Sequence, residues 1–120
     1  MNPIKRLSIA VVSFTFLAMP CIGLAAQVNV SIIDYAFSPQ LINVNAGDTV
    51  VWKNNGAMAH TVTSDTGAFI SSGTLQPGAS ATTTFNQAGT FGYHCASHGS
   101  AGTGMYGSVV VAATSTSASS

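Results

Sequence analysis

Apolar and polar residues alternate along much of this chain, which is the pattern of half-buried β-strands. Val28, Val30 and Ile32 alternate with polar residues near the start of the pattern. Runs rich in β-branched and aromatic residues predict further strands at 41–44, 49–53, 61–63, 81–85, 90–95 and 108–113. Turn-forming residues separate these runs, and no stretch has sustained helical periodicity. The pattern predicts an all-β, Greek-key β-sandwich or barrel with seven to eight strands.

One segment between the strands has turn chemistry and apolar residues together. Residues 67–73 begin and end with glycine and include Phe69 and Ile70. We expect a loop here, with both apolar side chains packed beneath it.

The N-terminus has the layout of a secretory signal peptide. Lys5 and Arg6 precede a mostly apolar run over residues 7–19, which Pro20 and small residues follow. The run is shorter than the roughly 20 residues that a membrane span needs. We expect cleavage after Ala25 or Ala26, with an uncleaved anchor as the alternative.

These features divide the chain of 120 residues into three parts. They are a signal peptide at 1–26, one domain at 27–113, and a polar, low-complexity tail at 114–120. The expected location is outside the cytoplasm, in a periplasm or another extracytoplasmic space, and the mature protein is expected to have no membrane span.

Removal of the signal peptide changes the charge and the cysteine count. One lysine and three aspartates remain, which gives a formal net charge of −2. This excludes a nucleic-acid-binding protein, because almost no cation is left to neutralise phosphates. Cys95 becomes the only cysteine, with no partner for an intramolecular disulfide. It is then a buried bystander, an intermolecular bridge, a reactive thiol or a metal ligand.

Cys95 lies in a stretch that is rich in soft metal ligands. Cys95 and His98 have C-x2-H spacing, and Met105 closes the 13-residue stretch that begins at Tyr93. Thiolate, imidazole and thioether together suit copper better than calcium or magnesium. A mononuclear copper site needs a second imidazole, and His60 is the best supplier. The predicted metal ligands are therefore His60, Cys95, His98 and Met105.

Two other side chains compete for these roles. His94 is adjacent to Cys95, and neighbouring residues of a strand point to opposite faces, so we expect His94 to be exposed. Met58 lies two residues before His60 and is the rival of Met105. We prefer Met105, because the glycines before it let the chain curl back toward His98.

With these residues in place, the chain resembles the cupredoxins, small blue copper proteins of the plastocyanin and pseudoazurin type. The similar segments are 37–39, 46–52, 60–62, 72–78 and 89–95, together with His98 and Met105. The resemblance implies a Greek-key β-sandwich in which His60, Cys95 and His98 form a trigonal copper plane. Met105 would be the long axial ligand.

Three positions depart from the family pattern. The segment from His98 to Met105 is two residues longer than in plastocyanins, and His94 stands where plant plastocyanins have tyrosine. Ser97 stands where many relatives have proline, so it keeps a backbone N–H. We hypothesise that this N–H donates a second hydrogen bond to the Cys95 sulfur and raises the reduction potential.

The resemblance implies an electron carrier rather than an enzyme. One copper ion would cycle between Cu(I) and Cu(II), and redox protein partners would dock on an apolar face around His98. The expected rim of that face is Ala57, Met58, Ala101 and Tyr106, and the protein is expected to be a monomer. The alternatives are a copper carrier or storage protein, a red-type copper site with altered axial ligation, a copper enzyme, and a metal-free β-sandwich interaction module.

Overall fold

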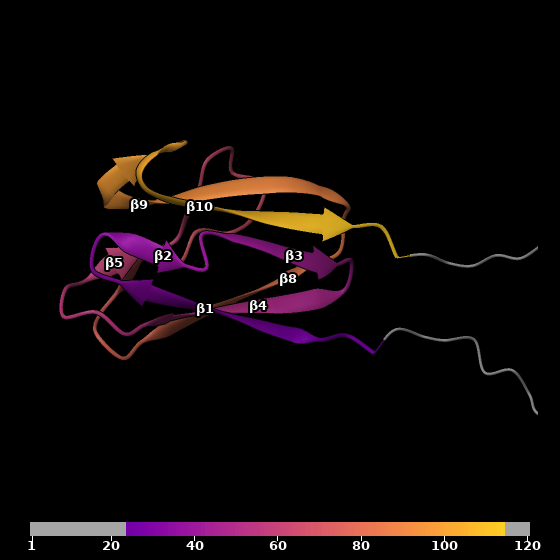
Figure 1. Cartoon of the computed structure of the whole chain (residues 1–120), viewed down its shortest axis with the longest axis horizontal. Helices are drawn as coiled ribbons and strands as arrows, with labels where there is room; N and C mark the ends of the chain where they lie inside the picture. The colour runs from indigo at the N-terminus through magenta and orange to yellow at the C-terminus, as the bar shows by residue number, and fades with distance from the viewer. Residues whose placement is uncertain (1–23, 115–120) are drawn as a thin grey trace, which may run out of the picture.

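A computed structural model describes residues 24–114 of the chain. Ten strands lie in this part of the chain (Figure 1). They are β1 (Gln27–Ile33), β2 (Ala36–Ser38), β3 (Leu41–Asn45), β4 (Asp48–Asn54), β5 (His60–Thr61), β6 (Thr63–Ser64), β7 (Thr74–Leu75), β8 (Ser80–Phe85), β9 (Gly89–Ser100) and β10 (Thr103–Ala112). Seven of them have at least three residues, and β5, β6 and β7 have two each.

The strands form two four-stranded sheets and a two-stranded ribbon. The sheet orders are β2-β1-β4-β8 and β3-β10-β9-β6, and β5 pairs with β7. The pairs β1–β4 and β3–β10 are parallel, and the other pairs are antiparallel. The β9–β10 pair lies on one side of the sandwich and β1–β4 on the other (Figure 1). The prediction of an all-β sandwich is confirmed.

The core lies between the sheets and is built by the alternation seen in the sequence. In β4, Val50 and Trp52 are buried and Lys53 is exposed. Trp52 contacts the rings of Tyr93 and Phe85 at centroid distances of 5.4 and 6.3 Å. This aromatic cluster ties β4 and β8 to β9 across the sandwich, so the strand that carries Cys95 is held by the core.

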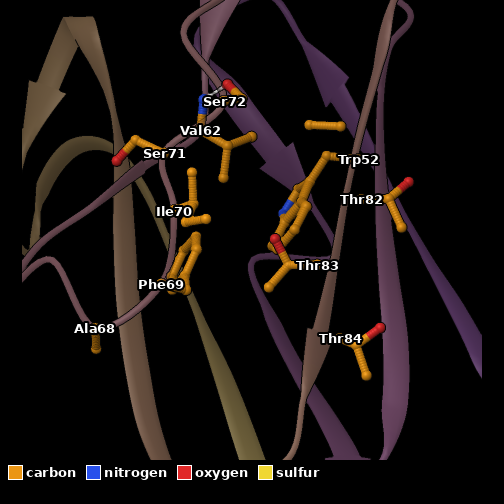
Figure 2. A pocket seen from close by; sticks show the side chains of 11 residues that line it. Trp52, Val62, Ala68, Phe69, Ile70, Ser71, Ser72, Thr82, Thr83 and Thr84 are labelled. Atoms are coloured by element: carbon orange, nitrogen blue, oxygen red, sulfur yellow. Dashed lines mark hydrogen bonds between the residues drawn. The ribbon is translucent and has the colours of Figure 1, made fainter.

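The expectation for residues 67–73 is right for one apolar side chain and wrong for the other. Phe69 stacks on Trp52 with a centroid distance of 5.9 Å, whereas Ile70 is 90% exposed (Figure 2). The hydroxyls of Ser71 and Ser72 accept hydrogen bonds from the N–H groups of Ser64 and Val62. These bonds fix the backbone beside β6, so that Phe69, and not Ile70, packs on Trp52.

The last two strands are longer than the sequence pattern predicts. β9 continues past Cys95 to Ser100, and β10 begins at Thr103 rather than at residue 108. The pairing extends to Thr103 opposite Ser100, with a register shift between Gly104 and Tyr106. The segment from Cys95 to Met105 is therefore the end of a bulged hairpin, not an open loop.

The predicted strand 61–63 is divided in two. Val62 interrupts it, because Ser72 occupies both of its backbone groups: the Val62 N–H donates to Ser72 Oγ, and the Val62 carbonyl accepts from the Ser72 N–H. β5 can then turn toward β7 while β6 joins β9. This change of direction places His60 at the end of the sandwich.

Most of the predicted signal peptide and tail lies outside the described residues. Both ends of the described chain lie at the end of the sandwich opposite β5 and the β9–β10 turn (Figure 1). The part of the chain that the structure describes contains no helix that could span a membrane.

Candidate metal centre

Three of the four predicted ligands converge at one end of the sandwich. Cys95 Sγ lies 3.8 Å from His60 Nδ1 and 3.5 Å from His98 Nδ1, and the three atoms are all within 4.8 Å of one another. Thiolate sulfur and imidazole nitrogen lie about 2.0–2.3 Å from a divalent ion such as zinc, which puts two such donors about 3.7 Å apart. The donor atoms therefore fit around a single metal ion.

Strand geometry explains this convergence. Cys95 shares the inward face of β9 with Tyr93, and both are fully buried. His60 begins β5 and is also buried, while His98 is partly exposed. Thr61 joins the two elements: its N–H points at Cys95 Sγ over 3.5 Å, and its hydroxyl accepts from the Ala96 N–H at 2.8 Å.

The fourth predicted ligand, Met105, lies in β10 beside the ligand hairpin. Its side chain is 1% exposed. Gly99 packs directly against it, since a Cβ at Gly99 would lie 2.6 Å from Met105 N and O. The rival Met58 is 40% exposed, and its sulfur accepts a hydrogen bond from the Tyr35 hydroxyl at 3.4 Å. Burial in the hairpin favours Met105 over Met58.

The surroundings of Cys95 favour its thiolate form. Burial alone would raise the pKa of the thiol, but four neighbours lower it to about 6. They are the Thr61 N–H, the His60 ring, the Ser97 N–H and the His98 ring. A thiolate is the form that binds metal, so the site is prepared for a soft cation.

We predict that the thiolate absorbance of the metal-free protein titrates with a midpoint near pH 6. An ordinary thiol titrates near 8.5. Because the folded-state pKa is depressed, this group stabilises the fold above the unfolded value, and that contribution is lost as pH falls through about 6. Ultraviolet titration checks this, with Cys95→Ser as the blank. A midpoint at 8.5 or higher would show that the neighbours do not act on the sulfur.

Sequence reasoning missed two residues beside the imidazoles. Asp34 Oδ1 lies 2.9 Å from His60 Nε2, and the Tyr35 ring meets the His98 ring edge-on at 5.2 Å. Both belong to the turn between β1 and β2, where Tyr35 has a φ of 69°. Positive φ is unusual for a tyrosine. The available signal was a carboxylate in a turn of a chain with only three acidic residues.

The hydrogen bond between Asp34 and His60 affects both groups. It lowers the pKa of the Asp34 carboxyl, with help from the Ala57 N–H. Burial opposes protonation of His60, but the hydrogen bonds to Asp34 and Cys95 outweigh it and raise the pKa of the ring.

The prediction that His94 is exposed is wrong. Its side chain is 18% exposed, and Nδ1 is hydrogen-bonded to the Asp65 carboxylate. Gly92 makes room for this pair, because a Cβ there would lie 2.3 Å from Asp65 Oδ2. The second part of the prediction agrees with the structure, since His94 is outside the group formed by His60, Cys95 and His98.

Ser97 offers a direct test of how the backbone acts on the sulfur. The Ser97 N–H is among the groups that lower the Cys95 pKa. Ser97→Pro removes this donor, so we predict a lower reduction potential, because a hydrogen bond to sulfur favours the less charged Cu(I) state. Ser97→Ala keeps the N–H and should leave the potential unchanged. Voltammetry of the two variants decides, and equal potentials would refute the hypothesis.

A β-sandwich in which a thiolate and two imidazoles converge at one end defines the cupredoxins, the small copper proteins. A family model described as copper binding proteins, plastocyanin/azurin family, matches residues 24–112. The chain belongs to this family, and copper is the metal that its donor set fits.

Similar proteins agree with this assignment. Plastocyanin from Scenedesmus fuscus is 33% identical, over 62% of this chain and 85% of the relative. Chloroplastic plastocyanin from Tetradesmus obliquus is 35% identical, but the match spans only 57% of that relative. The chain therefore spans little more than half of the chloroplastic form.

Solved structures show the same fold. The structure of an oxidized mutant of amicyanin is 31% identical, with a TM-score of 0.62 over 71% of this chain and 81% of that chain. A purple cupredoxin from Nitrosopumilus maritimus has the same TM-score at 23% identity, which is similarity of fold alone.

Proposed function

We propose that this protein carries single electrons between redox partners outside the cytoplasm, through one copper ion held by His60, Cys95, His98 and Met105. The convergence of the buried Cys95 sulfur with two imidazole Nδ1 atoms carries the proposal. Copper at this position would supply a one-electron Cu(II)/Cu(I) couple. The protein contributes a rigid support, since β5, β9 and β10 hold the donors in place.

The same arrangement supports a carrier rather than an enzyme. Within residues 24–114, one group of at least three histidine, cysteine or acidic side chains has its donor atoms close enough to share a metal ion, namely His60, Cys95 and His98. A hollow of the sandwich beside Trp52 and Phe69 is lined by none of these residues (Figure 2). Copper enzymes of related fold add further copper centres. A single group of ligands instead matches an electron carrier with one copper ion.

His98 supplies the route to a partner. It is partly exposed, the exposed Tyr35 ring meets its ring edge-on, and the Tyr35 hydroxyl in turn donates a hydrogen bond to the sulfur of the exposed Met58. We infer that this face of neutral side chains, next to the partly exposed Asp34 carboxylate, docks redox proteins briefly, as small redox interfaces do. Tyr35 extends the rim that the sequence predicts. The protein acts as an exported monomer in this proposal.

Electron transfer should depend only weakly on ionic strength. Lys53 is the single lysine or arginine beyond residue 26, and two of the three aspartates are paired with histidines. We predict that the rate at which hexacyanoferrate(III) oxidises the Cu(I) protein changes by less than about tenfold when salt is added. Tenfold is the low end of the rate changes that electrostatic steering produces. Stopped-flow rates measure this. Met58→Lys should make the rate fall with added salt, and a steep dependence in the wild type would contradict the inference.

The proposed function is tested by voltammetry of the copper-loaded protein. The proposal predicts a reversible one-electron wave with an unchanged protein after many cycles. Copper that binds but is lost on each reduction, or that binds only as Cu(I), would point to a carrier or storage protein instead.

A further inference from the structure

We propose that Asp34 is a positioning residue for the metal centre: its carboxylate holds the Nε2 proton of His60, turns Nδ1 toward the metal and stabilises Cu(II) over Cu(I). The proposal rests on the proposed function, because it concerns the metal bound by His60. It goes further by assigning a role to a residue that contacts no metal.

The contact is well defined on both sides. His60 Nε2 lies 2.9 Å from Asp34 Oδ1, while His60 Nδ1 faces Cys95 Sγ. Nε2 thus has an anionic acceptor, and Nδ1 faces the sulfur of a second candidate metal ligand. A neutral imidazole carries one proton, and the carboxylate fixes it on Nε2. The Nδ1 lone pair is then available for the metal.

The surrounding loop is built to hold this carboxylate. Asp34 Oδ2 accepts from the Ala57 N–H at 3.1 Å, and Oδ1 accepts from the Met58 N–H at 3.2 Å. Gly56 is required beside it, because a Cβ there would lie 2.3 Å from Asp34 Oδ1. The chain just before His60 therefore wraps around Asp34.

A buried asparagine holds that loop in turn. Asn54 is fully buried, and its amide donates to the carbonyls of Met58 and Leu75 at 2.8 and 2.9 Å. Its carbonyl oxygen accepts from the Gly56 N–H at 3.0 Å. The loop is thus fixed to β4 and to β7, which pairs with β5 at His60. Asp34 has a defined position relative to the ring.

The three aspartates have different surroundings. Asp48 accepts from the N–H groups of Ala26 and Asn45, and Asp65 binds His94. Asp34 alone among them contacts one of the converging residues. A carboxylate behind a ligating imidazole makes it more basic, and the added negative charge favours the more highly charged metal state. Asp34 should therefore lower the reduction potential, whereas the Ser97 N–H, which donates to the Cys95 sulfur, should raise it.

The test compares two substitutions that each remove one negative charge beside a histidine. Asp34→Asn alters the partner of His60, and Asp65→Asn alters the partner of His94. We expect Asp34→Asn to lower Cu(II) affinity about tenfold relative to Cu(I), which is an upward shift of about 59 mV for a one-electron couple. Asp65→Asn should shift the potential by less than half as much. Spectroelectrochemical titration gives the potentials, and chelator competition gives the affinities.

Equal shifts in the two variants, or no shift in Asp34→Asn, would overturn the proposal and leave the proposed function intact. A wild-type protein that binds no copper would overturn both. The variants are first compared by circular dichroism. A measurement on the Cu(I)-loaded wild type is independent of any variant: the Nε2 proton of His60 should resonate downfield and exchange slowly. A proton on Nδ1 instead, identified by nitrogen chemical shifts, would also overturn it.

Discussion

Replacement of Cys95 by serine is expected to abolish the intense visible absorption of the Cu(II)-loaded protein completely. The absorption arises from charge transfer between a thiolate and copper, and Cys95 is the only cysteine beyond the signal region. We also expect Cu(II) affinity to fall by more than about 100-fold, since loss of a supporting partner alone costs 10–100-fold. Absorption spectroscopy and chelator competition measure the two effects.

The matched control removes an exposed sulfur, that of Met58, and leaves the buried Cys95 in place. Met58→Leu deletes a thioether that is hydrogen-bonded to Tyr35 but is not buried with the ligands. The absorption band should keep its position and intensity in this variant. A band that survives Cys95→Ser, or one that disappears with Met58→Leu, would mean that the ligand assignment is wrong.

Gly99→Ala should have the second largest effect, because it acts on the backbone between His98 and Met105. The new Cβ would lie 2.6 Å from Met105 N and O and 2.8 Å from the Thr103 carbonyl oxygen. Backbone atoms cannot rotate away, so the hairpin must open. We expect the free energy of unfolding to fall by about 1–3 kcal/mol. The visible band should also shift, since Met105 moves relative to Cys95.

Gly102→Asn is the control in the same hairpin. Gly102 has a φ of 70° with open space where a Cβ would be, and asparagine tolerates this backbone conformation. This substitution should lower the free energy of unfolding by less than about 1 kcal/mol and leave the visible spectrum unchanged. Denaturant unfolding and absorption spectra of both variants make the comparison. A spectrum that Gly99→Ala leaves unaltered would indicate that Met105 is not an axial ligand.

The sequence predicts the fold well where alternation decides which face is buried. The inward face of β9 and the central strand around Trp52 follow directly from their period of two. The ends of strands depend on partners that are distant in sequence. The extension of β10 to Thr103 needs Ser100 opposite it, and the break at Val62 needs Ser72. Neither partner is visible in a local pattern.

Some residues of the candidate site could likewise be predicted from the sequence, and others could not. Cys95 and His98 are close in sequence and have ligand spacing, so their proximity could be predicted. His60 could be chosen because few other imidazoles exist. The contact between Asp34 and His60 could not be predicted, because it depends on how the β1–β2 turn packs on the loop before His60. The pairing of His94 likewise depends on the space that Gly92 leaves for Asp65.

Titration of the metal-free protein with Cu(II), followed by visible absorption, shows whether Cys95 holds a single copper ion together with His60 and His98. We expect an intense thiolate-to-copper band that grows linearly and stops at one equivalent of copper. A protein that stays colourless, or a band that continues to grow beyond one equivalent, would contradict a single copper ion held by Cys95 with His60 and His98.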